Sequence, residues 1–207
     1  MRKVREGCFE TNSSSMHCFI IAGTTPKPNH YGSRGFIRGS KIFEGEKLEI
    51  TASDIDFSSY CEDEPFLCSW IDRLCYVIGY GYHKQYWRKD ERRQFNDELT
   101  QIIQNHHPEI IEINFPDLNT IDGETYFINH QSQGTLETFL NDNNMTWEDF
   151  IFDDDIIIVP RSDGAEFKYI FQNLKEAGFD NFRTITFFEH TDKVSDVLKE
   201  EEDYYYE

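Results

Sequence analysis

Two short apolar runs constrain the fold more than any other feature of this chain. Residues 18–22 and 156–159 are its most apolar stretches, and each is only as long as a β-strand. The unbroken Ile-Ile-Ile-Val run at 156–159 predicts a fully buried strand, and residues 17–22 predict another strand. No apolar run approaches the roughly 20 residues that span a bilayer. The sequence therefore predicts buried strands and no contact with a membrane.

Two longer stretches show the spacing of helices. Apolar residues recur at three- and four-residue intervals after Pro65, and Gly79 and Gly81 are expected to end or kink this helix. A second helix is predicted over residues 83–105, and Pro108 stops it. These two helices are expected to be central to the fold.

The second half of the chain alternates between strand and helix patterns. Strands are expected at 110–115 and 125–130, a short helix at 134–141, and a strand, a helix and a strand at 156–159, 162–177 and 183–190. The last three elements, joined by short loops, form a βαβ-like unit. We therefore predict the α+β class: a single domain with a mixed β-sheet, two central helices and a C-terminal βαβ-like unit.

Charge is distributed unevenly along the 207 residues. The formal net charge is −19, of which residues 1–50 contribute +3, residues 51–108 contribute −4 and residues 109–207 contribute −18. Residues 1–199 are predicted to form the domain, and residues 200–207 an acidic, tyrosine-rich tail. Such a chain is not expected to bind nucleic acid directly over most of its surface. A host protein with a basic surface is the partner that its charge favours.

The sequence offers little sign of a metal or cofactor. The five cysteines include no CxxC pair and are expected to be free thiols in a reducing compartment. The basic N-terminus lacks the apolar stretch of a signal peptide, which also predicts an intracellular protein. No phosphate-binding, dinucleotide-binding or zinc-protease motif occurs, so neither metal nor cofactor is expected. Residues 153–155, three consecutive aspartates, could bind a divalent cation or form a solvated loop.

A run of hydroxyl and amide side chains lies just before the strand at 17–22. The segment at 9–17 reads Phe-Glu-Thr-Asn-Ser-Ser-Ser-Met-His. Its hydroxyls and backbone N–H groups could form a nest for a phosphate or a carboxylate. They could equally satisfy the backbone of an ordinary turn. His17 could act there as an acid, a base or a ligand.

This segment resembles the opening of a group of bacteriophage and prophage proteins of uncharacterised activity. They begin with a basic strand and the pattern F-E-T-N-S-S-S-x-H. A shorter His-Gln-Ser element of the same group is similar to residues 130–132. The resemblance implies a phage or mobile-element origin, and hence a location in the host cytoplasm. It implies no reaction or substrate.

If the strands beside the two motifs are neighbours, their polar side chains line one pocket. The catalytic candidates are then His17 and His130, because two histidines beside hydroxyls can support acid–base chemistry. The ligand-binding candidates are Asn12, Ser13, Ser14, Ser15, Gln131 and Ser132.

Two functions from different classes follow from these observations. The first is a phage-encoded acidic accessory protein that binds a host macromolecule, such as an inhibitor of a host defence or nucleic-acid-processing complex. The alternative is a small enzyme or nucleotide-like ligand binder that uses the Ser/His site. Self-association through the tyrosine-rich helical region near residues 80–87 is compatible with both.

Overall fold

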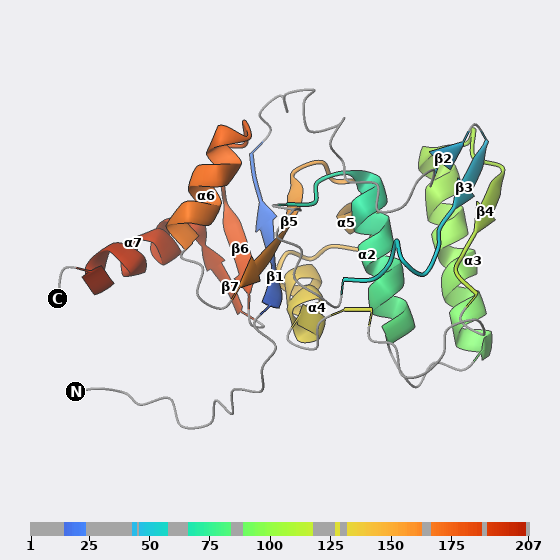
Figure 1. The fold of residues 1–207 in the computed structure, drawn as a ribbon, viewed down its shortest axis with the longest axis horizontal. Coiled ribbons are helices and arrows are strands. Elements are labelled where there is room, and N and C mark those ends of the chain that lie inside the picture. The colour runs from blue at the N-terminus through green and yellow to red at the C-terminus, as the bar shows by residue number, and fades with distance from the viewer. Residues whose placement is uncertain are drawn as a thin grey trace.

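The computed structural model describes residues 15–23, 43–44, 46–57, 66–83, 89–117, 127–128, 132–162, 167–187 and 190–205. These residues contain six helices and two β-sheets, which confirms the α+β class. Figure 1 shows a central four-stranded sheet with helices on both sides. The three-stranded second sheet lies beyond them, at the far end of the molecule from α7.

The larger sheet has the strand order β5-β1-β6-β7, with every neighbouring pair antiparallel. Its strands are β1 (Ser15–Ile21), β5 (Ile156–Ser162), β6 (Thr184–Phe187) and β7 (His190–Lys193). The two apolar runs of the sequence are therefore adjacent, with Ile20 opposite Ile157. The predicted strand at 183–190 is instead a strand pair, since β6 is followed by β7.

The predicted βαβ-like unit is present. Strand β5 is followed by α6 (Phe167–Glu176) and then by β6. Both strands run antiparallel to β1, which lies between them, so β5 and β6 are parallel to each other. The unit is thus a split βαβ arrangement, whose middle strand comes from the N-terminal part of the chain.

Alternating residues of the central strands belong to two separate cores. Cys18 and Ile20 of β1 pack with α6 and α7 (Val194–Tyr205), whereas Phe19 and Ile21 pack toward α2 (Trp70–His83) and its neighbours. In β5, Ile157 and Val159 belong to the first core, and Ile156 and Ile158 to the second. Successive side chains of a strand point to opposite faces, so a strand covered on both faces must be apolar throughout. This is the physical reason for the two unbroken runs.

Helix α2 does not end at its glycines, so of the two predicted alternatives, an end or a kink, the first is wrong. It continues through Gly79 and Gly81 to His83. A Cβ atom on Gly79 would lie 2.5 Å from the carbonyl oxygen of Ile55, and one on Gly81 would lie 2.4 Å from the Phe95 ring. The glycines therefore allow close packing against a loop and against α3 (Lys89–His106).

The predicted single mixed sheet is instead two sheets. The larger sheet is antiparallel, and the smaller one has the order β2-β3-β4. Strands β2 (Phe43–Glu44) and β3 (Lys47–Glu49) are antiparallel, whereas β3 and β4 (Glu112–Asn114) are parallel. The smaller sheet is therefore the mixed one. Both sheets contribute strands to the α+β fold.

Two shorter helices follow α3 along the chain. Helix α4 (Gln133–Asp142) packs on β1, β6 and β7, and α5 (Trp147–Phe152) packs on α2. Helix α5 begins with a capping box, in which the Thr146 hydroxyl accepts from the Asp149 N–H and the Asp149 carboxylate accepts from the Thr146 N–H.

The C-terminal helix has no counterpart in the sequence-based prediction. Helix α7 continues to Tyr205, so the expected boundary between domain and tail at residue 200 lies inside a helix. Val194 and Val197 of α7 are buried against α6 and the central sheet. Hence α7 covers one end of that core.

Candidate functional site

The two segments that carry the sequence motifs meet at His17 and Ser132. The backbone N–H of His17 donates to the Ser132 hydroxyl oxygen at 2.9 Å, and the His17 Nδ1 lies 3.0 Å from the same oxygen. Both contacts are satisfied when the serine hydroxyl donates to Nδ1 of a neutral imidazole. Ser132 occupies the N-cap position of α4, but its side chain makes no capping bond. It binds β1 to the start of α4 instead.

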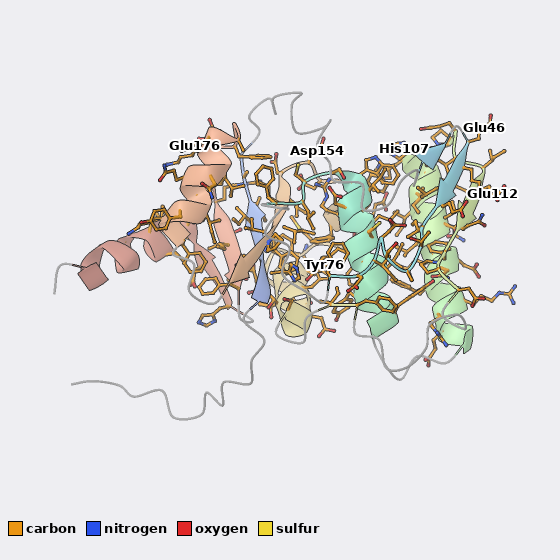
Figure 2. The ribbon with its side chains drawn as sticks, in the orientation of Figure 1. Glu46, Tyr76, His107, Glu112, Asp154 and Glu176 are labelled. Atoms are coloured by element: carbon orange, nitrogen blue, oxygen red, sulfur yellow. The ribbon has the colours of Figure 1, made fainter. Side chains whose placement is uncertain are left out.

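Aromatic rings surround this pair. The imidazole of His17 makes edge contacts with Tyr76 and Phe57, at ring-centroid distances of 5.2 and 6.3 Å. Tyr76 of α2, labelled in Figure 2, also contacts Phe19 of the central sheet, at a ring-centroid distance of 5.5 Å. Burial raises the pKa of the Tyr76 phenol, and an interaction with Ser132 lowers it by less. Within the described part of the chain, the Tyr76 hydroxyl nevertheless makes no hydrogen bond of ordinary geometry.

Burial limits the chemistry of the pair. His17 is 3% exposed and Ser132 is fully buried. A proton donor or nucleophile must reach its substrate, and these atoms face the protein interior. In the described structure the pair links a strand to a helix.

The other residues of the predicted Ser/His site are only partly placed. Asn12, Ser13, Ser14, His130 and Gln131 lie outside the described residues. Ser15 begins β1, opposite Ser162, and so belongs to the strand rather than to the preceding loop. The structure therefore brings His17 and Ser132 together. Ligand binding and catalysis by this set stay predictions.

The three consecutive aspartates have separate surroundings. Asp153 follows the last turn of α5, and Asp155 pairs with Arg183 at 3.2 Å. Asp154, labelled in Figure 2, is exposed and lies 3.5 Å from the fully buried guanidinium of Arg73. The described residues contain no group of three or more His, Cys, Asp or Glu side chains placed to hold a metal ion.

Arg73 was not singled out in the sequence, and it holds three elements together. Its guanidinium donates to the carbonyl oxygens of Cys68, Ile151 and Ile156 at 2.7 to 3.0 Å. Burial lowers the pKa of Arg73, and Asp154 opposes this effect. The fixed fork of a guanidinium matches three diverging acceptors. Arg73 therefore fastens the start of α2 to α5 and β5.

A cleft of about 700 Å³ opens on the molecule away from the Ser/His pair. It is lined by one face each of α3 and α4, by the start of α5 and by one residue of α2. The lining residues are Glu98, Gln101, Ile102 and Asn105 of α3, Glu137, Leu140 and Asn141 of α4, Met145, Thr146, Trp147 and Glu148, and Tyr80 of α2. This concave region is hereafter the α3–α4–α5 cleft.

Among the described residues, three glutamates and no lysine or arginine line this cleft. The Tyr80 hydroxyl donates to Glu137. Burial and the neighbouring Glu137 raise the Tyr80 pKa well above its usual range, which keeps the phenol a donor and Glu137 its acceptor. The Glu148 carboxylate lies 2.8 Å from His106 Nε2. Glu98 is exposed and makes no hydrogen bond or ion pair with the described residues.

Two helix ends add to the negative potential of the α3–α4–α5 cleft. Asn105 lies in the last turn of α3, and Leu140 and Asn141 lie in the last turn of α4. The last carbonyl groups of a helix carry partial negative charge, equivalent to roughly half an electron. The start of α5 has the opposite polarity, but its capping box engages the N–H groups of Thr146 and Asp149, and Glu148 and Asp149 place negative charge in its first turn. The cleft is therefore suited to a cation.

The sequence contained a weak signal for this cleft. Residues 98, 101, 102 and 105 follow the spacing of one helix face, and 137, 140 and 141 do the same. Each set mixes polar and apolar residues, which is typical of a face at the border of a core. Nothing in the sequence shows that the two faces are opposite each other.

No known protein family, curated protein or solved structure matches the chain. No helix within the described residues combines the length and apolar character needed to cross a membrane.

Proposed function

We propose that this chain is a phage-encoded acidic accessory protein that binds a host macromolecule through a basic surface of that partner. The α3–α4–α5 cleft is the observation that carries the proposal. Three carboxylates, three side-chain amides and two aromatic residues line one concavity, and none of the lining residues that the structure describes is basic. Clefts lined by charge of one sign concentrate the electrostatic field and attract groups of the opposite sign.

The charge of the whole chain supports the same proposal. Residues 109–207 hold −18 of the net −19, and α4 and α5, two of the four helices that line the cleft, belong to that half. A surface of this sign repels nucleic acid and competes with it for a basic groove. The proposed role is therefore inhibition of a host defence or nucleic-acid-processing complex, at the groove where that complex binds its nucleic acid.

A capture experiment tests this function. The purified chain, immobilised, is incubated with a nuclease-treated bacterial lysate, and bound proteins are eluted with rising salt. Retained proteins are expected to be basic, to elute as salt rises, and to be displaced by added duplex DNA, because exposed charges are screened within about 3 Å at 1 M salt. Partners that neither salt nor DNA displaces would contradict the proposal.

One observation favours the second candidate, an enzyme or nucleotide-like ligand binder at the Ser/His site. The two motif segments, 115 residues apart, meet through His17 and Ser132. Its test is the shift in melting temperature caused by nucleoside mono-, di- and triphosphates, since a ligand of the native state raises stability. A shift in the natural protein that Ser132→Ala abolishes would support this candidate. No shift with any of these nucleotides would count against it.

A further inference from the structure

We propose that the α3–α4–α5 cleft receives an arginine side chain from a basic segment of the partner protein. This inference rests on the proposed function and specifies its chemistry. It names the group that is recognised, the residues that recognise it and the reason for arginine rather than lysine.

The carboxylates provide the charge for this recognition. Glu98 approaches the cleft from α3, Glu137 from α4 and Glu148 from α5, so the three charges surround the concavity. A carboxylate has two oxygens and about four acceptor positions, so a carboxylate that already accepts a hydrogen bond can accept from a further donor. Hydrogen bonds between a guanidinium and a carboxylate are about twice as strong as those between neutral groups.

The aromatic wall favours a planar cation. The rings of Trp147 and Tyr80 lie 5.8 Å apart, centroid to centroid, with an angle of 47° between their planes. A guanidinium stacks on an indole face, and tryptophan is the best aromatic partner for such a cation. Leu140 and Met145 add apolar surface for the methylene groups of an arginine side chain.

Neutral acceptors complete the site. Gln101, Asn105 and Asn141 place side-chain amides along the cleft, and the last turns of α3 and α4 end there. Five N–H donors of one guanidinium need several acceptors in different directions, whereas a lysine has three donors at a single point. The cleft volume of about 700 Å³ is within the roughly 300–1,000 Å³ of ligand pockets, so it admits a short segment of chain.

Fluorescence anisotropy with labelled peptides tests this inference. The probes are a six-residue peptide of alternating arginine and glycine, its lysine counterpart, and spermidine as an unlabelled competitor, all at about 0.15 M salt, where the Debye length is about 8 Å. The arginine peptide is expected to bind about threefold or more tightly than the lysine peptide. Trp147→Leu is expected to reduce that preference, because it removes the stacking surface.

The decisive comparison uses two triple variants with equal loss of charge. Glu98→Gln, Glu137→Gln and Glu148→Gln together are expected to weaken arginine-peptide binding about tenfold or more. Glu176→Gln, Asp192→Asn and Asp196→Asn remove three charges on α6, β7 and α7, none of which lines the cleft, and are expected to change it less than about twofold. Glu98→Gln alone breaks no contact among the described residues. It should weaken binding measurably while the fold, followed by circular dichroism, is unchanged.

Several outcomes would overturn the inference. They are equal losses in the two triple variants, equal affinity for the arginine and lysine peptides, or displacement of the arginine peptide by spermidine at equal concentration. A captured host partner that binds the cleft triple variant normally would refute this inference and leave the proposed function intact. Peptide binding that depends on the cleft, together with no basic partner in the lysate, would support this inference and refute the proposed function.

Discussion

At the scale of single residues, buried polar groups determine how the segments of this chain are joined. Ser132 occupies the N-cap position of α4 but makes no capping hydrogen bond. It binds His17 instead, across 115 residues of sequence. Arg73 binds three backbone carbonyl groups from separate parts of the chain. A buried donor or acceptor that loses its partner costs about 1–3 kcal/mol. Such residues therefore determine which segments of the chain contact each other in the fold.

Ser132→Ala is expected to lower the free energy of unfolding by about 1–3 kcal/mol, since it leaves the N–H and Nδ1 of His17 without this partner. Urea denaturation at neutral pH measures the change. Ser195→Ala, at an exposed position of α7, is the matched control and should stay within about 0.5 kcal/mol. Equal effects of the two substitutions would show that the Ser132 hydroxyl is not a structural joint.

Arg73→Lys is expected to be far more destabilising than Asp154→Asn. A lysine cannot reach three diverging carbonyl groups, so at least one stays unpaired and about 2 kcal/mol or more is lost. Asp154 is 85% exposed and 3.5 Å away, and such pairs contribute about 0–1 kcal/mol. Thermal unfolding of both variants checks this. An equal loss from Asp154→Asn would mean that the ion pair, rather than the carbonyl groups, holds Arg73.

At the scale of elements, patterns of spacing predicted most of the fold, and tertiary contacts decided the rest. The strand at 17–22, the α5 capping box and the βαβ-like unit follow from local patterns, and all are present. The prediction that Gly79 or Gly81 ends α2 was wrong, because a glycine that ends a helix and one that permits close packing look alike in sequence. The Ser/His contact and the cleft depend on which helix faces which strand. No local pattern contains that information.

Gly81→Ala is expected to destabilise the protein, although alanine favours a helix by about 1 kcal/mol over glycine. Its added Cβ would lie 2.4 Å from the Phe95 ring, and overpacking typically costs about 1–3 kcal/mol. The free energies of unfolding of the natural protein, Gly81→Ala, Phe95→Leu and the double variant form a double-mutant cycle. Much of the cost of Gly81→Ala should disappear in the Phe95→Leu background. An unchanged cost there would exclude the ring as its cause.

The capping box of α5 predicts a dependence on pH. The Thr146 N–H and then its hydroxyl lower the pKa of Asp149. The stability that the ionised Asp149 carboxylate contributes is therefore complete above its unfolded pKa of about 3.9. It is lost as pH falls through the lower pKa of the folded state. Asp149→Asn removes a negative charge from the first turn and should cost about 0.3–1 kcal/mol at pH 7, and the difference should shrink below about pH 4. Urea titrations across this range measure it, with Asp142→Asn as control. A constant difference would contradict the assignment.

At the scale of the whole molecule, the acidic half of the chain and the cleft coincide in α4 and α5. The acidic second half of the chain provides α4 and α5, and α3 of the first half closes the cleft with Glu98. The Ser/His pair lies in the interior between α2, α4 and the central sheet. Under the proposed function, the cleft is the surface that the partner contacts, and the buried pair belongs to the scaffold behind it.

The slope of log Kd against log salt concentration for the arginine peptide tests the central claim most directly. A cleft that binds through charge predicts a steep loss of affinity as salt rises in the natural protein, because added ions screen the contact. It also predicts a nearly flat line for the variant with Gln at 98, 137 and 148. Equal slopes in the natural protein and this variant would contradict the account, since the charges that attract the peptide would then lie outside the cleft.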